Sequence, residues 1–268
     1  MDKLKKKKII LTTITIILFI VVLILIYLVF YKYVLKRSFE NSVLDFSNKN
    51  EETIFEIKDI TFFSNADSKN KYASSTNFTI ENLYQYTDMA IFITSPKEEK
   101  TLENTLKNVY IDNIKFTKTP ELGEASLYYK NISNFSKSDI IENNKINNRL
   151  DFNITSSDEA NLDTPTLYNN LANPIVLSYV NENIKTDYTL TDTSSPLTYD
   201  GSLLKRCGIL LNEISSSLSF DIYITNNLNE EFKTTVYIDI PLESDTESIY
   251  NGSVTLKKDI NNIFYRYK

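Results

Sequence analysis

The sequence has no histidine and no tryptophan, and it contains only one cysteine and four glycines in 268 residues. Without histidine there is no Ser–His or Cys–His nucleophile pair and no imidazole ligand for zinc. One cysteine excludes both an intrachain disulfide and a cysteine-rich metal site. Four glycines provide no phosphate-binding loop and no dinucleotide-binding motif. Catalysis would have to use a carboxylate pair or a Ser–Lys pair, and neither has a signature in the sequence.

One long apolar stretch lies near the N-terminus. Ile9–Tyr31 contains no charged residue, Gly, Pro or Asn. As a helix it runs about 35 Å, which is enough to cross a hydrocarbon core of about 30 Å with some tilt. It is longer than the apolar part of a signal peptide, and no small-residue cleavage site follows it. We therefore predict a single uncleaved transmembrane helix.

The basic residues that flank this stretch predict its orientation. Five lysines precede it, whereas two lysines and one arginine follow it by residue 37. Positive flanks are retained preferentially in the cytoplasm, so we expect the N-terminus inside and the bulk of the chain outside. The expected organisation is a cytoplasmic basic tail at 1–8, a transmembrane helix at 9–31, a stalk at 32–50 and an extracytoplasmic domain at 51–268.

The remainder of the chain is acidic. The first 37 residues hold eight basic side chains and one acidic one, so a total of −6 leaves −13 for the rest. A nucleic-acid-binding domain would instead present a basic surface. A large domain without disulfides that is rich in Lys, Asn and Ile indicates a bacterial cell envelope. We predict no cofactor, and the predicted partners are the lipid bilayer and a protein or glycan of the envelope.

Alternation of apolar and polar residues predicts strands after the stalk. The predicted strands are Thr53–Phe63, Asn77–Thr87, Met89–Ser95, Leu106–Lys118, Ala125–Phe135, Arg149–Ser156, Pro174–Ile184, Asp187–Asp192, Ser217–Asn227, Lys233–Leu242 and part of Ser253–Lys268. Between them we expect a polar loop at Asn65–Thr76, a short helical turn at Pro96–Thr105 and a turn-forming segment at Ser157–Leu171. The apolar residues of Ser202–Ile214 recur with no clear period.

Two local features of these strands are specific. A bulge at Asp112–Asn113 would restore the alternation within Leu106–Lys118. Ser217–Asn227 and Lys233–Leu242 form the clearest hairpin. About ten strands with almost no amphipathic helix predict an all-β fold, a β-sandwich of jelly-roll or immunoglobulin-like type. Phe220–Leu242 also resembles the paired strands of bacterial surface β-sandwich modules.

Tyrosine is abundant, with 18 Tyr beside 15 Phe. Aromatic rings bind sugars by stacking, and an exposed row of tyrosines would suit this role. Alternatively, tyrosine replaces Trp and Leu in the core and on half-buried strands, where its β propensity is high. The candidates for a ligand-binding row are Tyr84, Tyr86, Tyr128, Tyr129 and Tyr179.

Acidic loops provide the candidate metal ligands. Calcium is bound by several oxygen atoms from alternating loop positions. The first candidate set is Asp158, Glu159 and Asp163. The second set is Glu243, Asp245 and Glu247. Neither forms a complete calcium-binding loop motif, and acidic loops are also normal on the surface of an acidic domain.

The single cysteine, Cys207, follows Arg206, whose charge would lower the pKa of the thiol and raise its reactivity. Its other neighbours include Leu203, Leu204, Ile209 and Leu210. Such surroundings favour a small buried apolar residue.

Three functions fit these observations. The first is a non-enzymatic, membrane-anchored surface protein that displays a β-sandwich for structural or protein-interaction roles. The second is a membrane-anchored carbohydrate-binding module of the cell envelope. The third is a hydrolase that uses two carboxylates roughly 5 to 9.5 Å apart.

Overall fold

The computed structural model describes residues 3–49, 53–69, 78–130, 144–156, 164–190, 197–260 and 262–267. The chain divides into two units, Met1–Glu52 and Thr53–Lys268. Helix α1 (Lys3–Lys49) makes up the first unit. Its segment Leu11–Glu40 is long and apolar enough to cross a membrane. The sequence-based prediction of a long apolar helix at this position is confirmed.

Polar groups inside the apolar part of α1 are satisfied by the helix itself. Thr12 Oγ1 donates a hydrogen bond to the carbonyl of Lys8 (3.0 Å), and Thr15 Oγ1 donates to the carbonyl of Leu11 (2.9 Å). A hydrocarbon environment offers no water to these hydroxyls, so an internal acceptor lowers the cost of placing them there.

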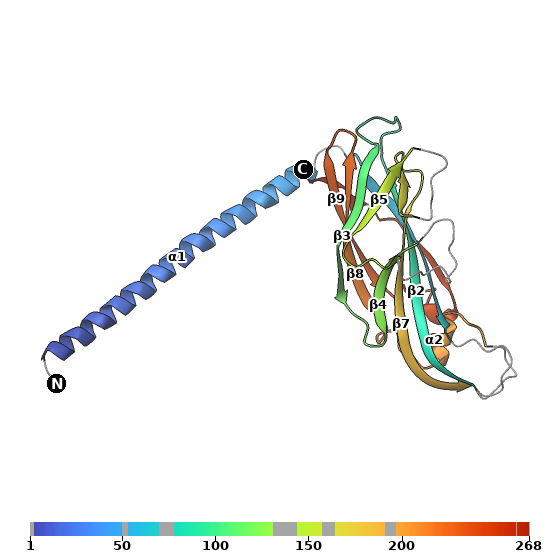
Figure 1. The fold of residues 1–268 in the computed structure, drawn as a ribbon, viewed down its shortest axis with the longest axis horizontal. Helices are drawn as coiled ribbons and strands as arrows, with labels where there is room; N and C mark the ends of the chain where they lie inside the picture. Colours follow the sequence, from blue (N-terminus) through green and yellow to red (C-terminus); the bar gives the residue numbers. More distant parts are fainter. Residues whose placement is uncertain are drawn as a thin grey trace. The chain divides into compact units, whose positions relative to one another are not determined.

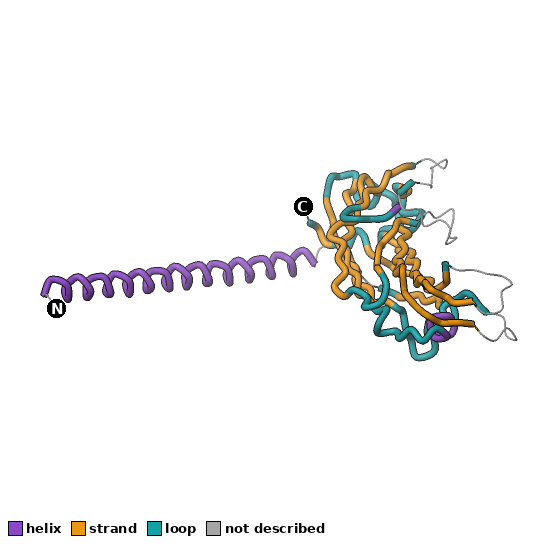
Figure 2. Tube along the Cα trace, turned by 60° about the horizontal axis from the view of Figure 1, so that its bottom comes forward, coloured by secondary structure: helices purple, strands orange, loops and turns teal. Residues whose placement is uncertain are grey.

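The second unit is a β-sandwich of two sheets packed face to face, which confirms the predicted fold class (Figure 1). Strands form most of this unit (Figure 2). Sheet A has the order β10 (Val254–Lys258), β1 (Glu56–Ser68), β2 (Phe78–Thr94), β7 (Ile175–Leu190) and β4 (Glu124–Tyr129), and β11 (Asn262–Ile263) also pairs with β1. Sheet B has the order β12 (Tyr265–Arg266), β9 (Glu231–Ile240), β8 (Ser216–Asn226), β3 (Leu106–Lys118), β5 (Leu150–Thr155) and β6 (Thr166–Tyr168).

The main core lies between the inner faces of the two sheets and includes the fully buried Phe55, Phe62 and Phe220. A second apolar cluster forms where the short helix α2 (Ser202–Arg206) lies near β1 and the 3-10 helix η3 (Ile249–Asn251). Each inward side chain alternates with an outward one along a strand, so both sheets also present an outer face.

The predicted hairpin and bulge are confirmed. Strands β8 and β9 pair from Ser216 opposite Ile240 to Thr225 opposite Glu231. The pairing of β3 with β8 shifts between Asp112 and Lys115, and Asn113 has a φ of 54°. Asparagine tolerates this left-handed conformation better than most residues, which explains how the bulge is accommodated.

Several predicted boundaries are wrong. The two strands expected on either side of Asp88 are the single strand β2, and those expected around Lys185–Thr186 are the single strand β7. Irregular pairing between β2 and β7 absorbs the local mismatch without ending either strand. Pro96–Thr105, where a short helical turn was expected, contains no helix. Residues predicted as loop or turn also form the end of β1 and the short strand β6, and helix α2 lies in Ser202–Ile214, for which no element was predicted. Their neighbours in the fold, which the sequence does not display, supply the missing hydrogen-bond partners.

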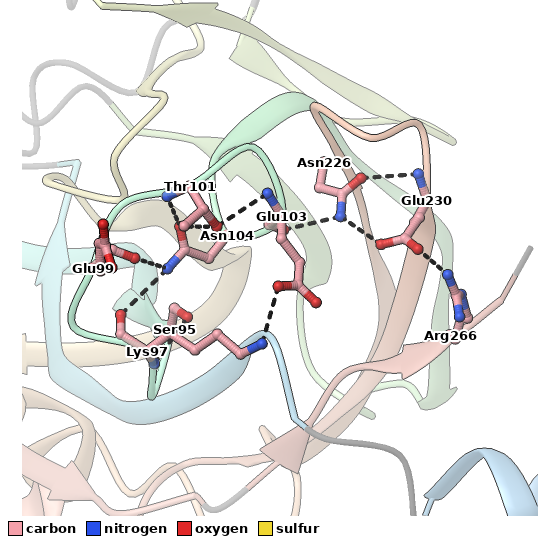
Figure 3. A network of polar contacts seen from close by, with 9 residues as sticks. All are labelled: Ser95, Lys97, Glu99, Thr101, Glu103, Asn104, Asn226, Glu230 and Arg266. Atoms are coloured by element: carbon pink, nitrogen blue, oxygen red, sulfur yellow. Dashed lines mark hydrogen bonds and ion pairs between the residues drawn. The ribbon is translucent and has the colours of Figure 1, made fainter.

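The loop before β3 is fixed to the β8–β9 turn by two buried asparagines (Figure 3). Asn104 Oδ1 accepts from the N–H of Thr101 (2.8 Å), and its Nδ2 donates to the carbonyl of Glu99 (2.7 Å). Asn226 Nδ2 donates to the carbonyl of Glu103 (2.9 Å) and to Glu230 Oε2 (2.9 Å). The side-chain amides of these two asparagines thus supply hydrogen bonds to backbone groups that have no strand partner in these loops.

We expect Asn226→Ala to lower the free energy of unfolding by about 2 to 3 kcal/mol, because it removes several hydrogen bonds of a fully buried amide and leaves their partly buried partners unpaired. Asn226 Oδ1 also accepts from the N–H groups of Leu228 and Glu230. The exposed neighbour Asn227, which donates to Thr105 Oγ1, is the matched control. Asn227→Ala should cost less than about 1 kcal/mol. Equal losses in urea unfolding, followed by tyrosine fluorescence, would contradict this assignment.

Candidate binding surface

The structure separates the five tyrosines that were predicted to form a ligand-binding row. Tyr84, Tyr86 and Tyr128 gather on the outer face of sheet A. Tyr129 and Tyr179 belong to the main core between the sheets. All except Tyr84 are buried, so the set does not form an exposed row of rings. Successive side chains of a strand point to opposite faces of the sheet, so these tyrosines lie on different faces. Apolar neighbours cover the buried ones.

The tyrosines on the outer face of sheet A surround an ion pair. Asp88 Oδ2 contacts Lys130 Nζ, and the two side chains are only 10% and 3% exposed. Lys130 Nζ lies 5.9 Å from the centre of the Tyr86 ring, and Tyr128 Oη donates to Glu182 Oε1 (3.4 Å). The cluster is packed like a small core of its own.

The acidic candidates do not form a metal centre in the part of the chain that the structure describes. Among these residues no three acidic, histidine or cysteine side chains come together as a metal-binding group. This finding includes Glu243, Asp245 and Glu247. The other candidates, Asp158, Glu159 and Asp163, lie outside the described residues.

A stacked group of aromatic residues lies on the outer face of sheet B, where no binding site was predicted. Arg149 stacks on Tyr110 with its guanidinium carbon 3.7 Å from the ring centre. The Tyr110 and Tyr223 rings are stacked, 4.6 Å apart and within 9° of parallel. Tyr267 packs edge-on against Tyr223 at 5.6 Å. We call these four residues, Arg149, Tyr110, Tyr223 and Tyr267, the tyrosine column.

Strand order explains the tyrosine column. Tyr110 on β3 lies opposite Asp151 on β5 and opposite Tyr223 on β8. Both tyrosines stand between inward-facing neighbours (Val109 and Ile111, Ile222 and Ile224), so both rings must point outward. Because β3 lies between β5 and β8, Arg149 and Tyr223 cover opposite faces of the Tyr110 ring.

The bulge in β3 connects the tyrosine column to a charged pair. Asn113 Nδ2 donates to Asp221 Oδ2 (2.7 Å) and to Tyr223 Oη (3.3 Å). Asp221 also accepts from Thr235 Oγ1 (2.6 Å) and contacts Lys233 Nζ (2.9 Å). Burial raises the pKa of Asp221, but the hydrogen bonds from Thr235, Lys233 and Asn113 outweigh it, and the pKa is lowered. The carboxylate therefore stays ionised and fixes its neighbours.

Two phenols of the tyrosine column have raised pKa values. Burial, followed by a hydrogen bond from Tyr110 Oη to Glu231 Oε1 (3.0 Å), raises the pKa of Tyr110 to about 12. Burial also raises the pKa of Tyr223. Both phenols therefore remain neutral at physiological pH and keep their hydroxyl protons available for hydrogen bonds.

An open hollow of about 300 Å³ lies elsewhere on the sandwich, and its lining residues are Thr246, Glu247, Ser248, Asn251, Ser253, Val254 and Thr255. This lining contains one carboxylate and no aromatic ring. It therefore lacks both the acid pair that glycoside hydrolysis uses and a ring on which a sugar stacks.

Cys207 is half-buried and free. Burial raises the pKa of its thiol to about 11, despite the opposing effects of Thr186 and Arg206. Desolvation thus outweighs the charge of Arg206, which favours the predicted small, largely apolar role of Cys207 over the alternative of a reactive thiol.

We expect alkylation of Cys207 by iodoacetamide to be slow and to rise about tenfold per pH unit from pH 7 to pH 10, because only the thiolate reacts. A rate that levels off below pH 9 would show an ordinary thiol and contradict the raised pKa. A free thiol such as N-acetylcysteine, measured in parallel, provides the control.

Comparison of the chain with protein-family models, curated proteins and solved structures gives no match. The function is therefore argued from the geometry of the sandwich.

Proposed function

We propose that the chain is a single-pass, non-enzymatic membrane protein that binds a protein partner through the outer face of sheet B. The apolar helix anchors it in the membrane of a bacterial cell. The more basic N-terminal flank of this helix supports an orientation with the N-terminus in the cytoplasm and the sandwich outside.

The observation that carries this proposal is the tyrosine column. Tyrosine and arginine are enriched among the residues that dominate binding energy at protein interfaces. Stacking and hydrogen bonds hold the buried part of the column in place before binding, so little side-chain entropy is lost when a partner arrives. Within the column Tyr267 is 50% exposed, and Tyr237, four residues from Lys233 on β9 of the same sheet, is 74% exposed. They are the aromatic groups that a partner would reach first.

A protein partner fits this face better than a glycan. A sugar stacks on a free ring face, but Arg149 and Tyr223 cover both faces of Tyr110. The column offers ring edges and hydroxyl groups beside the charges of Lys233 and Asp221. Such a mixture of aromatic and charged groups is typical of the rim and centre of protein–protein interfaces.

Photo-crosslinking in cells that produce the protein tests the proposal. A photoreactive phenylalanine analogue replaces Tyr237 or Tyr267 on sheet B, and Phe92, which is 38% exposed on sheet A, is the matched control. We expect a discrete protein adduct from positions 237 and 267 and none from 92. Arg149→Ala, at an exposed residue, should weaken the adduct at 237.

Absence of a protein adduct from sheet B, or equal adducts from all three positions, would contradict the proposal. Binding of the purified protein to a glycan array without any protein adduct would support the carbohydrate-binding alternative instead.

A further inference from the structure

The ion pair between Asp88 and Lys130 spans three strands of sheet A. Lys130 directly follows the edge strand β4, and its backbone N–H donates to the carbonyl of Val176 on β7 (3.1 Å). Asp88 lies on β2, at the other side of β7. The lysine side chain therefore crosses β7 to bring Nζ into contact with Asp88 Oδ2.

The surroundings of this pair disfavour separated charges. The lysine side chain is 3% exposed and the aspartate side chain 10%. Tyr86, Tyr128 and Val180 form the buried cluster beside them. Removing an ammonium and a carboxylate from water is costly, and replacing both by one neutral amide removes this cost.

Unpaired polar atoms beside the pair suit a neutral product. Asp88 Oδ1 and Ser178 Oγ are both buried without a hydrogen-bond partner. Ser178 lies directly opposite Asp88 in the pairing of β2 with β7. An ionised carboxylate requires donors at both oxygens, whereas the single oxygen of an amide requires fewer, so the unpaired Oδ1 of Asp88 fits an amide better than a carboxylate.

From this geometry we propose that Lys130 and Asp88 are joined by an intramolecular amide bond. Lys130 Nζ attacks Cγ of Asp88, the Nζ–Cγ bond forms and the Cγ–Oδ2 bond breaks. The departing oxygen leaves as water with two protons that the ammonium nitrogen held. The condensation requires no oxidant, metal or activated co-reactant.

The bond would attach the short edge strand β4 to β2 across β7. The residues that it joins are 42 positions apart in the sequence. With a single cysteine the chain cannot form an intrachain disulfide. The amide would therefore give the sandwich a covalent cross-link of another type.

Mass spectrometry of the purified full chain tests the proposal. We expect an intact mass lower than that of the sequence by one water molecule, and a branched tryptic peptide that contains both Asp88 and Lys130. Asp88→Asn should form the same bond with loss of ammonia. Asp88→Ala and Lys130→Arg should show their full sequence masses.

A wild-type mass equal to that of the sequence, with separate peptides for the two residues, would overturn the proposal. So would a loss of water that persists in Asp88→Ala or maps to another peptide. The measurement on the wild-type chain decides the question even if a variant fails to fold.

Discussion

Replacing Lys130 by Met is expected to lower the free energy of unfolding of the sandwich by about 4 kcal/mol. If the amide bond exists, the variant opens a loop of 42 residues, and the loss of that closure costs about 4 kcal/mol by the relation used for disulfides. If only the ion pair exists, the change leaves Asp88 as a buried, uncompensated charge, which costs about 3 to 5 kcal/mol. Urea unfolding of the chain in detergent, followed by tyrosine fluorescence, measures the change.

The double variant Asp88→Leu, Lys130→Met distinguishes the two origins of this loss. Replacing both members of a buried ion pair by apolar residues is often neutral, so stability would return to near the wild-type value if the pair were only ionic. The covalent bond predicts that the double variant stays about as unstable as Lys130→Met. Wild-type stability of the single variant would contradict both explanations.

Gly201→Ala is expected to cost about 3 kcal/mol, because a methyl group at this position has no space. A Cβ on Gly201 would lie 2.2 Å from the carbonyl oxygens of both Ile249 and Gly252. These atoms belong to the backbone and cannot rotate away as a flexible side chain could. The substitution would therefore push α2 away from η3 and open the second apolar cluster.

Gly208→Ala is the matched control for this prediction. A Cβ on Gly208 would have no atom within 4 Å, but the φ of +73° at this residue is unfavourable for alanine. We expect a cost of only about 1 to 2 kcal/mol from the backbone conformation. A Gly201→Ala variant that is as stable as Gly208→Ala would show that the close approach of α2 and η3 relaxes without cost.

The sequence predicted the local features of the fold and missed those that depend on distant partners. Uninterrupted apolar residues identified the helix, and strict alternation identified the β8–β9 hairpin. Asp88 appeared to interrupt a strand because its partner Lys130 is distant in the chain. A buried polar residue that is paired elsewhere in the fold looks, in sequence, like a residue of a turn.

The candidate binding surface shows the same limit of local patterns. Tyr110 and Tyr223 are each flanked by two aliphatic residues, a pattern that predicts an outward-facing ring on a strand. Their alignment depends on the register between β3 and β8, which joins positions 113 residues apart. Of the five tyrosines that the sequence predicts to form a ligand-binding row, all except Tyr84 are buried, because burial depends on packing between strands that lie far apart in the sequence.

The central claim is that the sandwich is displayed outside the cytoplasm. Protease treatment of intact cells that produce the protein with a C-terminal epitope tests it most directly. A sandwich displayed outside the cytoplasm predicts that the epitope disappears while a cytoplasmic marker protein stays intact. An epitope that is protected in intact cells and is lost only after lysis would place the sandwich in the cytoplasm. That result would contradict the proposal of an externally displayed binding domain.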